Sequence, residues 1–129
     1  MSITFWNPAN PAQYEDRYDS LYEDTYSVWV GGGLELNLSN SNALELLQFL
    51  NVPKPTYGGE IPARELEALC RRAIIRLNNI PDLDEEIPTR IDGGIITPRR
   101  PAGYLKERTE QLLQVACSRV SDNDKIFWG

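Results

Sequence analysis

The chain has 129 residues, no histidine and a net charge of −6, with 41% hydrophobic and 25% charged residues. These values are typical of one compact folded domain and exclude a disordered tail. Histidine is the commonest acid–base catalyst and metal ligand near neutral pH. Its absence excludes Ser-His-Asp and Cys-His catalysis and histidine-bearing metal sites. The sequence therefore predicts no metal and no cofactor.

The acidic residues are concentrated in the first half of the chain. Residues 1–60 hold eight acidic and two basic side chains, whereas residues 61–129 hold eleven of each. Duplex nucleic acid is recognised first through its phosphates, which require a basic footprint on the protein. We therefore expect no duplex nucleic acid among the partners.

Three features predict a soluble protein of the cytoplasm. The first residues lack the basic start and the apolar run of a signal peptide. No segment approaches the roughly 18 apolar residues that a membrane span requires. Cys70 and Cys117 each lie among apolar neighbours in a helix-like stretch. We expect two reduced core thiols, which fit a reducing compartment, and a disulfide between helices is the alternative.

A tyrosine recurs at every fourth position of one acidic segment. The four are Tyr14, Tyr18, Tyr22 and Tyr26, and the pattern Tyr-Glu-Asp-x-Tyr occurs twice. This step aligns the rings along one stripe of a helix or on one face of a strand, so the spacing leaves both conformations open. We expect the rings either to pack on the protein's own core or to bind another protein or a second copy, because tyrosine is enriched at interfaces.

The clearest strand signal surrounds three consecutive glycines. Val28-Trp29-Val30 precedes Gly31-Gly32-Gly33, and Leu34, Leu36 and Leu38 then alternate with polar residues. This alternation is the period of a half-buried strand. No phosphate-loop pattern follows the glycines. They are interpreted as a turn, and the alternatives are a bulge or a close approach of the backbone to another segment.

Three helices follow in the remaining chain. The first begins within residues 39–42, ends before Pro53 and turns Leu44, Leu47, Phe49 and Leu50 inward. The second starts near Pro62 and ends at Asn78, with an apolar stripe that includes Leu66, Cys70, Ala73 and Leu77. The third covers residues 104–120 and turns Leu105, Leu112, Ala116 and Val120 inward. Residues 82–86 form a solvated acidic loop, residues 87–97 one or two short strands, and residues 126–128 a closing strand.

Four arginines are candidates for binding an anion. Arg72 and Arg76 lie four residues apart on the second predicted helix, and Arg99 and Arg100 precede the third. If these segments meet, the guanidinium groups suit a phosphate, a carboxylate or an acidic protein segment. The strand-to-helix turn around Ser39 adds free backbone N–H groups. Solvated helix faces with internal ion pairs explain the same arginines without a ligand.

Carboxylate catalysis needs two acids in different environments. Glu35, on the predicted strand, and Glu60, at the turn before the second helix, are the acids least obviously exposed to solvent. Nothing in the sequence brings them together.

These patterns predict a single α+β domain over residues 1–129, with three helices packed on a small, at least partly antiparallel sheet. Residues 1–26 are expected to form an extended aromatic and acidic N-terminal arm, and residues 27–129 a compact core. The leading hypothesis is a non-enzymatic protein-interaction module of the bacterial accessory type: immunity, antitoxin or adaptor-like. The alternative is a small-anion or metabolite-binding domain, including an acid-dependent hydrolase. A structural homodimer joined by the tyrosine segment is the third hypothesis.

Overall fold

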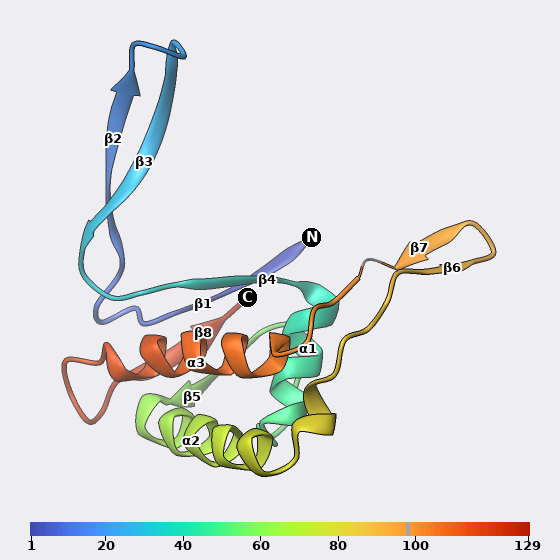
Figure 1. Cartoon of the computed structure of the whole chain (residues 1–129). Helices are drawn as coiled ribbons and strands as arrows, with labels where there is room; N and C mark the ends of the chain where they lie inside the picture. The colour runs from blue at the N-terminus through green and yellow to red at the C-terminus, as the bar shows by residue number, and fades with distance from the viewer. Residues whose placement is uncertain (98) are drawn as a thin grey trace.

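The centre of the protein is a four-stranded antiparallel sheet (Figure 1), seen in a computed structural model that describes residues 1–97 and 99–129. Its strand order is β4-β1-β8-β5. The strands are β1 (Ser2–Trp6), β4 (Leu36–Ser39), β5 (Gly59–Pro62) and β8 (Lys125–Trp128). The two ends of the chain are therefore neighbours in the middle of the sheet, where Phe5 is opposite Trp128.

Three helices pack against one face of this sheet. They are α1 (Asn40–Phe49), α2 (Ala63–Asn79) and α3 (Tyr104–Cys117). Alternate strand residues point into the layer between sheet and helices, and there they join the apolar stripes of the helices in one core. The core includes Ile3, Phe5, Leu36, Leu38, Leu46, Leu47, Leu66, Cys70, Leu112, Val115, Ile126 and Trp128.

Two β-hairpins extend away from this layered core (Figure 1). The longer one pairs β2 (Gln13–Asp19) with β3 (Asp24–Gly31). The shorter one pairs β6 (Arg90–Asp92) with β7 (Ile95–Thr97) through Gly93 and Gly94, both of which have positive φ. A short 3-10 helix, η1 (Pro81–Asp84), lies between α2 and the shorter hairpin.

The predicted α+β class is confirmed, as are the three helices, the shorter hairpin and the closing strand. The predicted N-terminal arm takes another form. Residues 2–6 belong to the central sheet, and residues 13–31 form a hairpin that continues past residue 26. The sequence prediction contained no strand at β1 or at β5, because neither carries a long alternating pattern.

The three glycines mark a close approach of two backbone segments, which was one of the alternatives to a hairpin turn. They connect β3 to β4 and lie against residues 10–11, where a Cβ on Gly32 would come 2.2 Å from the Pro11 carbonyl oxygen. A Cβ on Gly33 would come equally close, 2.2 Å, to the carbonyl oxygen of Asn10, which accepts the Gly33 N–H at 3.0 Å. Glycine is required here because two backbone segments meet without room for side chains.

Three predicted burial patterns also need correction. Leu46, and not Leu44, is a fully buried position of α1, and Val120 is exposed because α3 ends at Cys117. The acidic loop is not wholly solvated. Asp84 is buried, and its carboxylate accepts the N–H groups of Leu105 (2.8 Å) and Lys106 (3.0 Å). This carboxylate thus caps the start of α3, a role that a distant residue can fill only in the folded chain.

Candidate functional site

The β2–β3 hairpin has two different faces. Directly opposite residues of an antiparallel pair share a face, and successive residues alternate. Tyr14 is opposite Trp29 and Tyr18 is opposite Thr25, so the two tyrosines and the tryptophan lie on one face. Tyr26 is opposite Arg17 and lies on the other face. The expectation that all four rings share one face fails because the chain reverses between Tyr18 and Tyr26.

All four tyrosines are exposed to solvent, Tyr22 most of all at 76% and Tyr18 at 65%. Packing of the rings on the protein's own core, one of the two expectations, is therefore wrong. Trp29 and Leu21 of the same hairpin are exposed as well. Large aromatic and apolar side chains on a protruding element are typical of contact surfaces.

The hairpin is also strongly acidic. It carries the acids Glu15, Asp16, Asp19, Glu23 and Asp24 and the single base Arg17. Arg17 pairs with Glu15 at 3.4 Å. At the tip, Asp19 is directly opposite Asp24, and like charges in that position destabilise a strand pair. A cationic surface placed against the tip relieves this repulsion.

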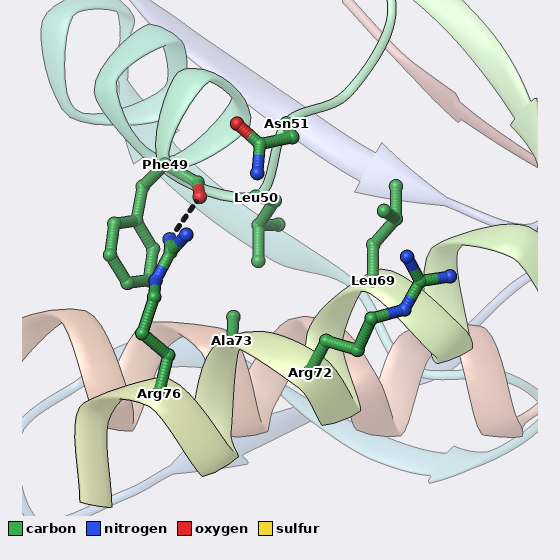
Figure 2. Close-up of a pocket in the computed structure, with 7 residues that line it drawn as sticks. All are labelled: Phe49, Leu50, Asn51, Leu69, Arg72, Ala73 and Arg76. Atoms are coloured by element: carbon green, nitrogen blue, oxygen red, sulfur yellow. Dashed lines mark hydrogen bonds between the residues drawn. The ribbon is translucent and has the colours of Figure 1, made fainter. Parts of the chain in front are cut away.

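The four predicted anion-binding arginines do not form one cluster. Arg72 and Arg76 line a hollow of about 220 Å³ between α2 and the end of α1 (Figure 2). Arg76 donates to the Phe49 carbonyl oxygen at 2.6 Å, and its guanidinium lies 4.3 Å from the centre of the Phe49 ring. Arg76 therefore stabilises the end of α1, because the last carbonyls of a helix favour a cation.

Arg99 and Arg100 line a second pocket, of about 380 Å³, beside the strand-to-helix turn. Ser39, Ser41 and Asn42 from the start of α1 form another wall of this pocket, and Tyr104 also lines it. The structure thus brings these two arginines to the predicted turn. Each is already neutralised, since Arg99 pairs with Glu86 at 2.6 Å and Arg100 with Glu45 at 2.5 Å.

The acids singled out for catalysis are not brought together. Glu35 and Glu60 are both exposed, and Glu60 pairs with Lys125 at 3.2 Å. The buried acids are Asp84 and Asp124. The Asn7 amide donates to Asp124 at 3.0 Å, and this bond together with the Val120 N–H lowers the pKa of Asp124. Asp84 accepts two backbone N–H groups, and Asp124 accepts a side-chain amide and backbone N–H groups, so both carboxylates have a structural role.

The cysteines are free thiols, but only Cys70 is buried. Cys117 is exposed at the end of α3, so the prediction of two core thiols is wrong for it. Burial raises the pKa of Cys70 to about 12. Desolvation and the Glu67 carboxylate raise the pKa of Cys117. Both thiols are therefore protonated at neutral pH, and the thiolate is the nucleophilic form.

Glu67 joins α2 to α3. Its carboxylate accepts from Arg71 at 3.0 Å, from the Cys117 thiol at 3.3 Å and from Arg119 at 3.0 Å. Arg71, and after it Cys117, lowers the pKa of Glu67 from 4.5 to about 2. Sequence reasoning missed this group because Cys117 and Arg119 are distant in the chain.

No family model, curated protein or solved structure matches this chain. Within residues 1–97 and 99–129, no three acidic or cysteine side chains are grouped so that they could hold a metal ion. In the same part of the chain, no helix combines the length and the apolar content needed to cross a bilayer.

Proposed function

We propose that the chain is a non-enzymatic protein-interaction module of the bacterial accessory type, immunity, antitoxin or adaptor-like, whose β2–β3 hairpin docks on a cationic protein surface. The observation that carries the proposal is the combination of four exposed tyrosines and five acids on one protruding hairpin. Aromatic anchors supply contact area, and the acidic charge accelerates association with a basic partner. The free thiols of Cys70 and Cys117 support a reducing, cytoplasmic setting.

The isolated state of the hairpin supports the same proposal. A two-stranded sheet without a cover is marginally stable in water. Here both faces carry large side chains that are exposed, including Tyr18 on one face and Tyr26 on the other. A partner that covers one face supplies the missing layer. The face with Tyr14, Tyr18 and Trp29 is the better candidate because it carries three of the exposed rings, with Tyr14 directly opposite Trp29.

A photo-crosslinking experiment tests the proposal. A benzophenone amino acid replaces Tyr18 in the chain produced in its own cells, and replaces exposed Gln114 on α3 as the control. We expect a discrete protein adduct from position 18 and none from position 114. The purified adduct partner should bind the wild-type chain less tightly as salt rises, and less tightly after Tyr14→Ser with Tyr18→Ser. Identical adduct patterns from both positions would overturn the proposal.

The second candidate function is binding of a small anion in the pocket at Arg99 and Arg100. It is favoured by the convergence of these residues with the start of α1, which has no acidic residue in its first turn. A thermal-shift screen with phosphate and small carboxylates tests it. An anion at one hundred times its dissociation constant stabilises the fold by about 2.7 kcal/mol. A shift that Arg100→Gln does not reduce, or no shift at all, would exclude this candidate.

A further inference from the structure

The hollow between α1 and α2 has the size and chemistry of a receptor for one side chain. Its volume, about 220 Å³, is below the roughly 300–1,000 Å³ typical of small-molecule pockets. Phe49, Leu69 and Ala73 give it an apolar floor, and the side chains of Arg72 and Arg76 rise from α2 on either side of Ala73 (Figure 2). Because the Arg76 guanidinium already lies over the Phe49 ring, an aromatic ring that enters this site would find the Arg72 guanidinium beside it.

Arg72 is the cation that this site leaves available. Arg76 is committed to the Phe49 carbonyl oxygen. Arg72 is exposed, and among the described residues it belongs to no ion pair. An incoming carboxylate can therefore pair with the Arg72 guanidinium without displacing another acid.

The tip of the β2–β3 hairpin has the complementary chemistry. Tyr22 is the most exposed tyrosine of the chain, and Glu23 follows it at the turn. Asp19 and Asp24 are opposed directly behind them. The tip thus presents one ring together with three carboxylates, and the hollow presents an apolar floor together with the available guanidinium of Arg72.

Resting on the hairpin function proposed above, we infer that the docking surface for the tip is carried by a second copy of this chain. Tyr22 enters the hollow between α1 and α2, and the Glu23 carboxylate pairs with Arg72 of that copy. The chain cannot make this contact with itself, because the tip lies far from the junction of α1 and α2 (Figure 1). Each copy offers one tip and one hollow, so two copies can close reciprocally as a two-fold dimer, or the contact continues head-to-tail into a larger ring or a filament.

Two complementary variants test this arrangement. The first variant, Tyr22→Ser with Glu23→Lys, removes the ring and reverses the charge at the tip. The second, Arg72→Glu, reverses the charge at the hollow. These positions are exposed, so the fold is retained. Matched controls reverse a charge elsewhere: Glu110→Lys on α3 and Arg64→Glu on α2, both also exposed. Mass is measured by light scattering over a range of protein concentrations at about 0.05 M and about 0.5 M salt, which differ severalfold in screening length.

We expect the mass of the wild-type chain and of both controls to rise with concentration, and to rise less at the higher salt. Each of the two variants alone should stay at the mass of one chain. In their equimolar mixture, the mass should not exceed that of two chains. The tip variant supplies the only intact hollow and the Arg72→Glu variant supplies the only intact tip. A wild-type chain that stays monomeric, a mixture without pairs, or an Arg64→Glu variant as defective as Arg72→Glu would overturn the inference. If the chain is monomeric and position 18 crosslinks to a different protein, the proposed function of the hairpin stands and the self-contact is excluded.

Discussion

The chain contains two kinds of antiparallel sheet that differ in what covers them. In the four-stranded sheet, the inward residues of every strand are buried under the helices. In the β2–β3 hairpin, whose strands are longer, most side chains on both faces are exposed. Both sheets are antiparallel. Burial, and not β-structure as such, therefore separates the part that holds the fold from the part available for contact.

The two regions are joined at a small polar base. Asn7 donates to Asp124 at 3.0 Å, and the Asn10 amide donates to the Ser118 carbonyl at 2.7 Å. The Trp29 indole donates to the Gly33 carbonyl at 3.2 Å. These bonds fix the direction in which the hairpin leaves the core, and its tip projects away from the core (Figure 1). The base is therefore the point where a mutation can act on both regions.

The largest effect is expected from removal of a ring at the centre of the core. Phe5 is 0% exposed and packs against Trp128, with ring centres 6.2 Å apart. Phe5→Ala should lower the free energy of unfolding by about 3–5 kcal/mol, because it combines lost burial with a cavity. Urea denaturation followed by circular dichroism measures this loss. Phe127→Ala, on the half-buried outer face, is the matched control and should cost less. Equal losses would mean that the helix-covered face is not the main core.

A smaller effect is expected at the base of the hairpin. Gly33→Ala places a methyl group 2.2 Å from the Asn10 carbonyl oxygen, so one of the two backbone segments must move. Overpacking of this kind costs about 1–3 kcal/mol. Gly58→Ala is the control, because its nearest neighbour, the Trp128 carbonyl oxygen, is at an ordinary 3.6 Å. Thermal unfolding of both variants measures the difference, and a Gly33→Ala protein as stable as the control would show that the contact is not tight.

The same comparison explains how much the sequence could predict. The helices and the short hairpin were predictable because apolar periodicity, N-cap residues and the Asp-Gly-Gly turn are local signals. β5 was not, because its four residues carry one inward side chain, Ile61, and owe their conformation to pairing with β8. The position of β1 beside the last strand is likewise a long-range pairing.

The candidate sites were only partly predictable for the same reason. The tyrosine spacing singled out the segment, but the faces of its rings depend on where the chain turns, at residues 20–23. The arginine count could not predict that Arg72 and Arg99 would line different hollows. Nor could it predict which acids would neutralise them, since Arg100 pairs with Glu45 from a distant helix.

A third prediction concerns the acid stability of the helix layer. The folded pKa of Glu67 is about 2, below the ordinary 4.5, so its ionised form stabilises the folded state. This contribution is complete above pH 4.5 and is lost as the pH falls towards about 2. Glu67→Gln lacks it, so the stability gap between the wild type and this variant should narrow across that window. Urea midpoints at several pH values measure the gap, with exposed Glu110→Gln as control. A gap that stays constant with pH would exclude an electrostatic role for Glu67.

The smallest effect on stability is expected where the sequence is most unusual. Tyr18 is 65% exposed and lies on a hairpin outside the core, so Tyr18→Ser should change the free energy of unfolding by less than about 0.5 kcal/mol. In the isolated chain, the amide hydrogens of β2 and β3 should exchange much faster than those of β1 and β8, because an uncovered hairpin opens without unfolding the core. Hydrogen-exchange mass spectrometry measures both regions in one sample. If β2 and β3 were as protected as β1, or Tyr18→Ser cost as much as a core substitution, the hairpin would belong to the cooperative core, and its rings would stabilise the fold. If the amide hydrogens of β2 and β3 exchange fast while the core stays protected, the tyrosines are available to a partner, whose binding would order the hairpin.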